Sequence, residues 1–184
     1  MLAGNAGAQL HAIPTAESGA IYEMEGYSVL SPRGKNWFEL KRDGHNVYFG
    51  KKIASSTHAF IATAMSAPIA EKFEKPGEFR DYVGKMLPLR GDDRHTVIEN
   101  LVELDQVAGR FCVRHYTKAE DRGALYAKGK MLLAETVGIS CLHPDSPGLS
   151  ISVSYTERGY PQEASAALRA EGESFVRSLR FTPR

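Results

Sequence analysis

Two cysteines and two histidines form the best candidate group for metal or nucleophilic chemistry in this chain. They are Cys112 and His115, with two residues between them, and Cys141 and His143, with one residue between them. Cysteine sulfur and histidine nitrogen are the usual ligands of tetrahedral zinc. Both pairs lie in runs typical of strands, where successive side chains point to opposite faces. Cys112 and His115 then face opposite ways, so four ligands converge only if a β-bulge reorients His115.

The second of these segments suggests another chemistry, nucleophilic hydrolysis. Cys141 or Ser140 would be the nucleophile, His143 the base, and Asp145 the acid that orients the base. Neighbours on one strand are poorly placed for such a pair, because their side chains diverge. The sequence contains no G-x-S-x-G, H-E-x-x-H or phosphate-binding loop motif. We therefore expect a protein that is not an enzyme, with no catalytic residue, no metal site and no cofactor.

The two cysteines also admit three interpretations as a pair. Cys112 and Cys141 form a disulfide, remain buried free thiols, or belong to a metal site. We favour the disulfide, which would close a loop of about 30 residues and stabilise the fold by about 3.5 kcal/mol in the chain-entropy model. A disulfide requires an oxidising compartment.

A polar binding patch is predicted where two strands end. Residues 131–143 and 149–156 have strand patterns, and the Pro-Asp-Ser-Pro-Gly run at 144–148 is typical of a turn between them. If the strands form a hairpin, four polar residues gather at one end of the sheet: His143, Asp145, Tyr155 and Arg158. The alternative is that each of them only ends a strand or begins a turn.

Charge and hydropathy exclude several classes of function. The chain has 23 basic and 22 acidic residues, a net charge of +1, and no basic stripe or acidic tail. This balance argues against a nucleic-acid binder or a polybasic membrane binder. No apolar run reaches the roughly 18 residues that a membrane-spanning helix needs. We expect a protein partner instead, and a chain that is a monomer or a weak oligomer.

The apolar pattern predicts a mainly antiparallel α+β fold with helices packed on the sheet. The clearest element is 149–156, where hydroxyl residues alternate with four apolar ones: Leu149, Ile151, Val153 and Tyr155. Residues 91–106 fit a helix or a strand, and we favour the strand, whereas the charged segment 118–130 predicts a surface loop. The remaining predictions are a four-strand meander at 26–32, 36–41, 45–50 and 57–66, strands at 110–117 and 131–143, and helices at 76–87 and from 161 onward.

The first twenty residues differ in character from the rest of the chain. They are small, polar or isolated apolar residues with no period and no basic side chain. This composition predicts a disordered tail at 1–20, followed by a single α+β domain at 21–184. The tail is similar to the start of an exported chain or to a trimmed signal peptide, although no apolar core segment is present; a cytosolic tail is the alternative. Together with the expected disulfide, it favours a periplasmic or secreted protein.

The order of elements resembles the PsbP-like α/β/α sandwich class, in particular uncharacterised exported bacterial proteins of that shape. The likeness spans about 22–181 and rests on a strand opening at 26–32, Trp37 on the next strand, the Cys-Leu-His-Pro run at 141–144 and the Phe-x-x-Ser-Leu motif at 175–179. None of these motifs is catalytic, and no functional residue of the class matches a position here. The resemblance implies a non-enzymatic binding or assembly role by analogy of fold.

We therefore predict a non-enzymatic binding or accessory protein of the bacterial cell envelope that acts through protein–protein contacts. Two alternatives remain open. One is a metal-dependent or hydrolytic enzyme that uses the cluster Cys112, His115, Cys141 and His143. The other is a self-associating structural protein whose interface is the hydroxyl-rich face of 149–156.

Overall fold

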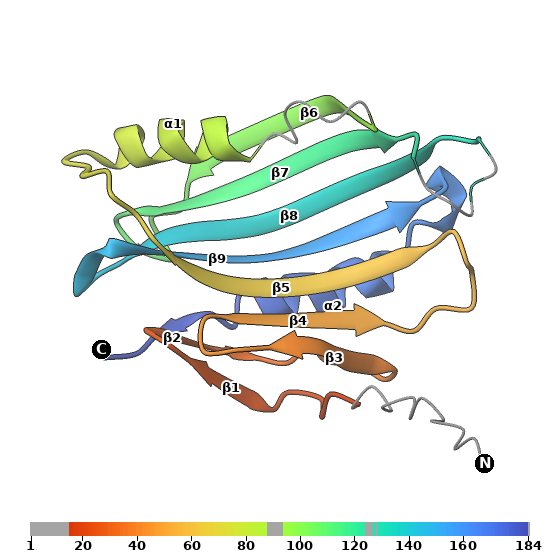
Figure 1. Ribbon diagram of the computed structural model, residues 1–184, viewed down its shortest axis with the longest axis horizontal. Coiled ribbons are helices and arrows are strands. Elements are labelled where there is room, and N and C mark those ends of the chain that lie inside the picture. Colours follow the sequence, from red (N-terminus) through yellow and green to blue (C-terminus); the bar gives the residue numbers. More distant parts are fainter. Residues whose placement is uncertain (1–14, 88–93, 124–126, 128, 184) are drawn as a thin grey trace, which may run out of the picture.

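The computed structural model describes residues 15–87, 94–123, 127 and 129–183, and its centre is a seven-stranded antiparallel sheet (Figure 1). The order of strands in this large sheet is β3-β4-β5-β9-β8-β7-β6, and a small three-stranded sheet has the order β1-β2-β10. The strands are β1 (Ile21–Met24), β2 (Tyr27–Leu30), β3 (Trp37–Arg42), β4 (Asn46–Lys51), β5 (Ala59–Pro68), β6 (His95–Leu104), β7 (Cys112–Asp121), β8 (Leu132–His143), β9 (Ser146–Gly159) and β10 (Arg180–Phe181). The helices are α1 (Pro76–Met86), the 3₁₀ helix η2 (Pro161–Glu163) and α2 (Ala166–Val176).

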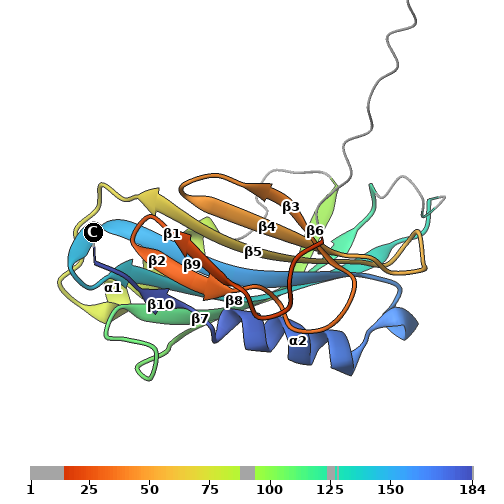
Figure 2. The ribbon, with the colours of Figure 1, turned by 90° about the horizontal axis from the view of Figure 1, so that it is seen from below.

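The two α-helices lie on opposite faces of the large sheet. Figure 2 shows α2 running along one face, where it packs mainly against β9. The small sheet lies on the same side, since Tyr27 of β2 and Phe175 of α2 belong to one buried core. On the other face α1 packs against β6 and β7, and its Phe79 and Val83 form a second core with Val113. The predicted α+β sandwich is confirmed.

Local sequence patterns explain most of these elements. In β9 the four alternating apolar residues are buried on the α2 face, and the serines between them are half-buried on the other face. Asp43 closes the β3–β4 hairpin, because its carboxylate accepts hydrogen bonds from the N–H groups of His45 (2.9 Å) and Asn46 (2.8 Å). Pro76 occupies the first turn of α1, where its missing N–H costs nothing.

The N-terminal part of the chain corrects two predictions. Residues 1–14 of the predicted tail lie outside the described residues, but 15–20 are placed on the domain: Ala16 is buried and its N–H donates to the Trp37 carbonyl (2.9 Å). The strand predicted at 26–32 is β2, yet it pairs with β1 and β10 and not with the meander. A left-handed glycine, Gly26 (φ +84°), turns the chain from β1 into β2. The meander therefore has three strands, β3, β4 and β5.

Of three further predicted segments, two match the structure and the third is wrong in part. The helix predicted at 76–87 is confirmed as α1, and 91–106 contains the strand β6, while 91–93 lie outside the described residues. The predicted loop at 118–130 is wrong for its first four residues, because β7 continues to Asp121 and pairs there with both β6 and β8.

The final helix begins later than predicted. Residues 161–163 form only the 3₁₀ turn η2, and α2 starts after Ser165, whose hydroxyl accepts the N–H of Leu168 (3.4 Å). A serine in this position satisfies one of the free N–H groups of the first helical turn.

Candidate functional site

The two cysteines face each other on neighbouring strands and form a disulfide. Cys112 of β7 is the direct partner of Cys141 of β8, with Cα atoms 4.1 Å apart. Both residues are buried under the α2 layer. The structure confirms the favoured interpretation of the pair, the disulfide. Neither sulfur is therefore a free nucleophile or a thiolate ligand in this state.

His115 points to the opposite face of β7, as the strand period requires. Its side chain is 2% exposed, and neither ring nitrogen has a hydrogen-bond partner. Burial, followed by the charge of Arg114, lowers the pKa of His115 to about 4, so the ring is neutral near pH 7. The ring fits because Gly138 lies opposite it on β8: a Cβ there would lie 2.6 Å from the imidazole Cε1 atom.

His143 has a structural position at the end of β8. Its Nδ1 accepts the N–H of Asp145 (3.1 Å), and its Nε2 lies 3.0 Å from the carbonyl oxygen of Thr182. The tautomer with the proton on Nε2 satisfies both contacts. The ring also meets the edge of Phe181 at a centroid distance of 5.6 Å. His143 thus fastens the segment after β10 to the β8–β9 turn.

These positions correct the zinc and nucleophile hypotheses for the cluster of Cys112, His115, Cys141 and His143. The sulfurs are bonded to each other, His115 lies on the other face of the sheet, and no bulge reorients it. In the part of the chain that the structure describes, no group of three or more His, Cys, Asp or Glu residues is placed to hold a metal ion. The same described segments contain no helix that is both long and apolar enough to cross a membrane.

The predicted polar patch is also corrected, because the register of the β8–β9 hairpin separates its members. His143 lies opposite Ser146 at the turn, next to Asp145, but Tyr155 lies far along β9 opposite Val137. Tyr155 stacks on Phe60 under α2 (5.4 Å between ring centroids), whereas Arg158 faces the other side and reaches Asp121 at 3.4 Å. Positions 155 and 158 are an odd number of residues apart, so one strand cannot turn both to the same face.

Three of the four hydroxyls on the face named in the self-association hypothesis are hydrogen-bonded within the sheet. Cross-strand pairs of hydroxyls lie within hydrogen-bond distance: Thr63 with Ser154 at 3.0 Å, Thr136 with Thr156 at 2.8 Å, and Ser140 with Ser152 at 3.1 Å. The hydroxyls in these pairs are therefore already hydrogen-bonded and are less available to a self-association interface. Self-association stays a prediction.

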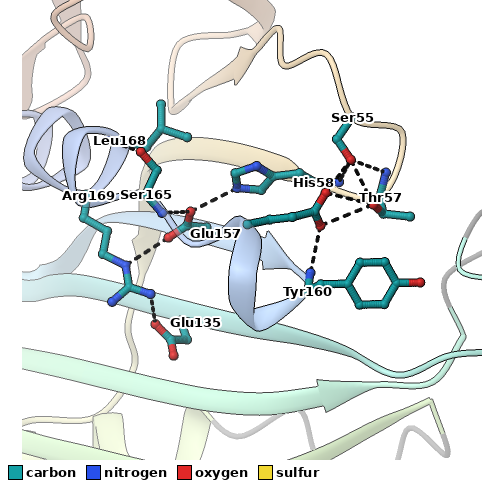
Figure 3. A network of polar contacts seen from close by, with 10 residues as sticks. Ser55, Thr57, His58, Glu135, Glu157, Tyr160, Ser165, Leu168 and Arg169 are labelled. Carbon is teal, nitrogen blue, oxygen red and sulfur yellow. Dashed lines mark hydrogen bonds and ion pairs between the residues drawn. The ribbon is translucent and has the colours of Figure 1, made fainter.

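A polar network at the start of α2 was missed by the sequence predictions (Figure 3). Glu157 of β9 is 5% exposed, and its carboxylate contacts His58 Nε2 (3.0 Å), the Ser165 N–H (3.0 Å) and Arg169 Nε (2.9 Å). Arg169 also donates to Glu135 (2.6 Å). The missed signal is the period of β9: Glu157 continues the buried apolar face, where a carboxylate must find partners.

A second glutamate, Glu163, joins the β4–β5 connection to η2. Glu163 accepts hydrogen bonds from the hydroxyls of Ser55 (2.6 Å) and Thr57 (3.2 Å) and from the Tyr160 N–H (2.8 Å). These hydrogen bonds lower the pKa of Glu163, Ser55 contributing most. The Ser55 hydroxyl thus points to a carboxylate and not to the imidazole of His58, so no serine–histidine pair is formed. The network anchors α2 to the sheet.

A group of exposed apolar side chains lies at the border of the large sheet that β6 forms. Nine large apolar residues are exposed in the described part of the chain, and five of them lie on β6, on the turn after it or at the end of α1: Met86, Ile98, Leu101, Leu104 and Val107. We call these five residues the apolar edge. In Figure 1, β6 is the outermost strand of the sheet, with α1 beside it.

A hollow of about 600 Å³ adjoins the apolar edge, on the α2 side of the β6–β7 turn. Ile139, Val176 and Leu179 supply apolar lining, and Arg114 and Arg177 are among its charged residues. Arg114 is held by Glu173 (2.6 Å), which raises the pKa of the guanidinium. Val107 of the apolar edge also lines this hollow, so the two apolar surfaces meet at the turn.

Known proteins are similar to this chain in fold and not in sequence. No family model and no curated protein matches it. A single-substitution mutant of the protein Mog1 gives a TM-score of 0.51 at 8% identity, covering 89% of this chain and 96% of that one. LpqN of Mycobacterium tuberculosis, described as involved in cell envelope biogenesis, gives a TM-score of 0.52 at 11% identity, covering 86% of each chain. These likenesses show that the chain has the fold of the Mog1/PsbP-like proteins.

Proposed function

We propose that this protein is a non-enzymatic binding protein of the cell envelope, and that it binds another protein through the apolar edge. The observation that carries the proposal is the concentration of five of the nine exposed large apolar side chains around β6. Scattered apolar residues are normal on a protein surface, but a local group of them marks an interaction site. Burying such side chains against a partner contributes about 25 cal/mol per Å² of apolar area.

Two observations support a location outside the cytoplasm. The disulfide between Cys112 and Cys141 is buried, and disulfides persist mainly in oxidising compartments. LpqN, a protein of the same fold, is described as involved in cell envelope biogenesis. A protein that binds partners in the envelope is consistent with both.

The non-enzymatic part of the proposal rests on how the candidate catalytic groups are engaged. The sulfurs of Cys112 and Cys141 are bonded, His143 holds the C-terminal segment, and Ser55 donates to Glu163. Nucleophilic catalysis requires a nucleophile within hydrogen-bond reach of a base. None of these described groups is arranged in that way.

The test is a crosslinking experiment followed by binding of the purified pair. A photo-crosslinking amino acid at Leu101 captures the partner in the native host, and the partner is then purified and titrated with this protein. We expect Leu101→Ser to weaken that binding by about tenfold, which corresponds to about 1.4 kcal/mol of lost apolar contact. The matched control is Ile61→Ser, because Ile61 is an exposed aliphatic residue (40%) on β5, away from β6. Equal effects of the two substitutions, or a captured protein that fails to bind when purified, would refute the proposal.

A further inference from the structure

We infer that the outer edge of β6 binds an extended segment of the partner as an eighth strand of the large sheet, and that this segment alternates aliphatic and basic residues. The inference rests on the proposed function and specifies how the partner is recognised. Strand addition of this kind takes its affinity from main-chain hydrogen bonds and its specificity from alternate side chains.

The first reason is the orientation of the β6 main chain. Among the described strands, β6 is the last strand of the large sheet and pairs with β7 alone. The Asp105 N–H donates to the Cys112 carbonyl (2.9 Å), which fixes the alternation of the antiparallel ladder. Residues 101 and 103 therefore direct their main-chain groups to β7, whereas 100, 102 and 104 direct theirs outward. The bond from the Leu142 N–H to the Phe111 carbonyl (3.0 Å) agrees, since it turns the residue before Cys112 toward β8.

These outward groups are left without partners. Within the described segments, no hydrogen bond reaches the outward N–H or C=O groups of residues 100, 102 and 104. An unpaired strand edge is a template for another strand, and proteins usually block it when it has no role. The free stretch, residues 100–104, is long enough for a short strand pairing.

The second reason is the set of side chains along this edge. Ile98, Leu101 and Leu104 are 54%, 50% and 38% exposed. Leu104 lies on the α1 face of β6 with Val102, whereas Leu101 lies on the opposite face, the one that carries Glu99 and Glu103. The aliphatic side chains of an alternating strand would therefore cover Leu104, because directly opposed side chains in a sheet lie close together, and the methylene stems of its basic side chains would cover Leu101.

The third reason is charge. Glu99 and Glu103 lie on either side of Leu101, on the face of β6 that also carries it. Their cross-strand neighbours on β7 are the basic residues Lys118 and Arg114, but these pair with other carboxylates, at 3.2 Å and 2.6 Å. No ion pair to either glutamate is present among the described residues. Basic residues in the added strand would provide the missing opposite charges.

The same charges argue against a second copy of this chain as the added strand. An antiparallel pairing of two β6 strands centred on Leu101 sets Glu99 opposite Glu103 of the other copy, twice. Like charges directly opposed across strands are destabilising. A strand from a different, basic protein avoids this repulsion.

The experiment uses fluorescent peptides of about ten residues, the length of a typical strand, as probes. One alternates valine and lysine, one alternates valine and glutamate, and one is the valine–lysine peptide with N-methyl groups on its pairing edge. We expect the plain valine–lysine peptide to bind at least about tenfold more tightly than either control. The glutamate peptide lacks the charged hydrogen bonds and the methylated peptide lacks the main-chain hydrogen bonds, and the loss of one such bond corresponds to about tenfold in affinity. Equal binding of the lysine and glutamate peptides, or of the methylated and plain peptides, would overturn the inference.

The protein variants are Leu104→Pro and its matched control Leu104→Ser. Both remove the exposed leucine, but only proline removes the outward N–H, which the ladder with β7 does not use. We expect proline to weaken peptide binding about tenfold relative to serine. Should Leu104→Pro unfold the protein, the methylated peptide still tests main-chain pairing with the unaltered protein. A dimer of the wild type that Leu104→Pro abolishes would overturn the choice of a different partner.

Failure of this inference is separable from failure of the proposed function. If the crosslinked partner loses affinity with Leu101→Ser but binds Leu104→Pro and Leu104→Ser equally well, the apolar edge is the binding site and strand addition is wrong. If Leu101→Ser has no effect on that partner, the proposed function itself fails.

Discussion

Mild acidification should destabilise this protein through His115, because the folded chain buries the imidazole and leaves both of its nitrogens without partners. Burial and the nearby Arg114 lower the pKa of His115 from 6.5 to about 4. Below about pH 6.5 the unfolded chain binds a proton at this histidine, whereas the folded chain does so only near pH 4. The contribution of His115 is therefore complete above pH 6.5 and is lost as the pH falls toward 4. Linkage gives a loss of about 2 kcal/mol between pH 8 and pH 5, and about 3 kcal/mol by pH 4.

The measurement is urea unfolding of the wild type and of His115→Leu at several pH values from 8 to 5. This range lies above the titration of ordinary carboxylates, and the remaining histidines contribute equally to both proteins. Leucine also removes two unpaired buried nitrogens, so the variant should be at least as stable as the wild type at pH 8. We expect the free energy of unfolding of the wild type to fall by about 2 kcal/mol more than that of the variant. Parallel pH profiles, or an imidazole titration of the folded protein near pH 6.5, would refute the reasoning.

Three further predictions concern the stability of the fold. Replacing Cys112 and Cys141 together by alanine should lower the free energy of unfolding, measured in urea, by about 3.5 kcal/mol. An unchanged urea midpoint would show that closing the 29-residue loop does not stabilise the fold. Glu157→Gln should cost about 2 kcal/mol and accelerate amide exchange in the first turn of α2, because replacing the buried carboxylate removes its charged hydrogen bond to the half-exposed Arg169. Unchanged exchange there would show that the network does not anchor the helix. Gly138→Ala should cost about 1–3 kcal/mol, since its Cβ would overlap both the imidazole of His115 and the Cβ of Ser154, and adding His115→Ala should recover only the part of that loss due to the imidazole in the same urea assay.

Local periodicity made much of the fold predictable from the sequence. The alternation in 149–156 predicted both the strand β9 and its buried face, and the spacing of Phe79, Tyr82 and Val83 predicted the stripe of α1. The disulfide was also predictable, because both cysteines lie within clear strand patterns, although the sequence alone left two other interpretations open. These features depend on residues close in the chain.

Features that depend on register or on distant pairing were not predictable. β10 is two residues long and exists because it pairs with β2, about 150 residues earlier in the chain. The predicted patch failed for a different reason, because the spacing within the hairpin could be taken from the sequence. Tyr155 lies seven residues beyond the predicted turn at 144–148, and the odd spacing of Tyr155 and Arg158 places their side chains on opposite faces.

The ambiguity of β6 has a specific cause in the structure. A β-bulge between Val97 and Glu99 shifts the register with β7, so Val97, Asn100 and Val102 share one face although their spacing is irregular. The exposed Ile98 and Leu101 added apolar positions that belong to no core, and together these residues imitate a helical stripe. The irregular pattern was therefore a sign of an exposed apolar edge.

The other border of the large sheet shows that an open edge is not a general property of this fold. On β3 the edge is covered: the Ala16 N–H donates to the Trp37 carbonyl, and Thr15 forms a bridge with Phe38. A β-bulge follows between Glu39 and Lys41, and the strand ends in two exposed basic residues, a composition that opposes the addition of another strand. β6 has a bulge near its start but then keeps a regular stretch up to Leu104, with exposed aliphatic residues and with no strand of the described segments on its outer side. Since one sheet protects its first border and leaves the second open and apolar, the second is the border where a partner strand would gain both hydrogen bonds and buried surface.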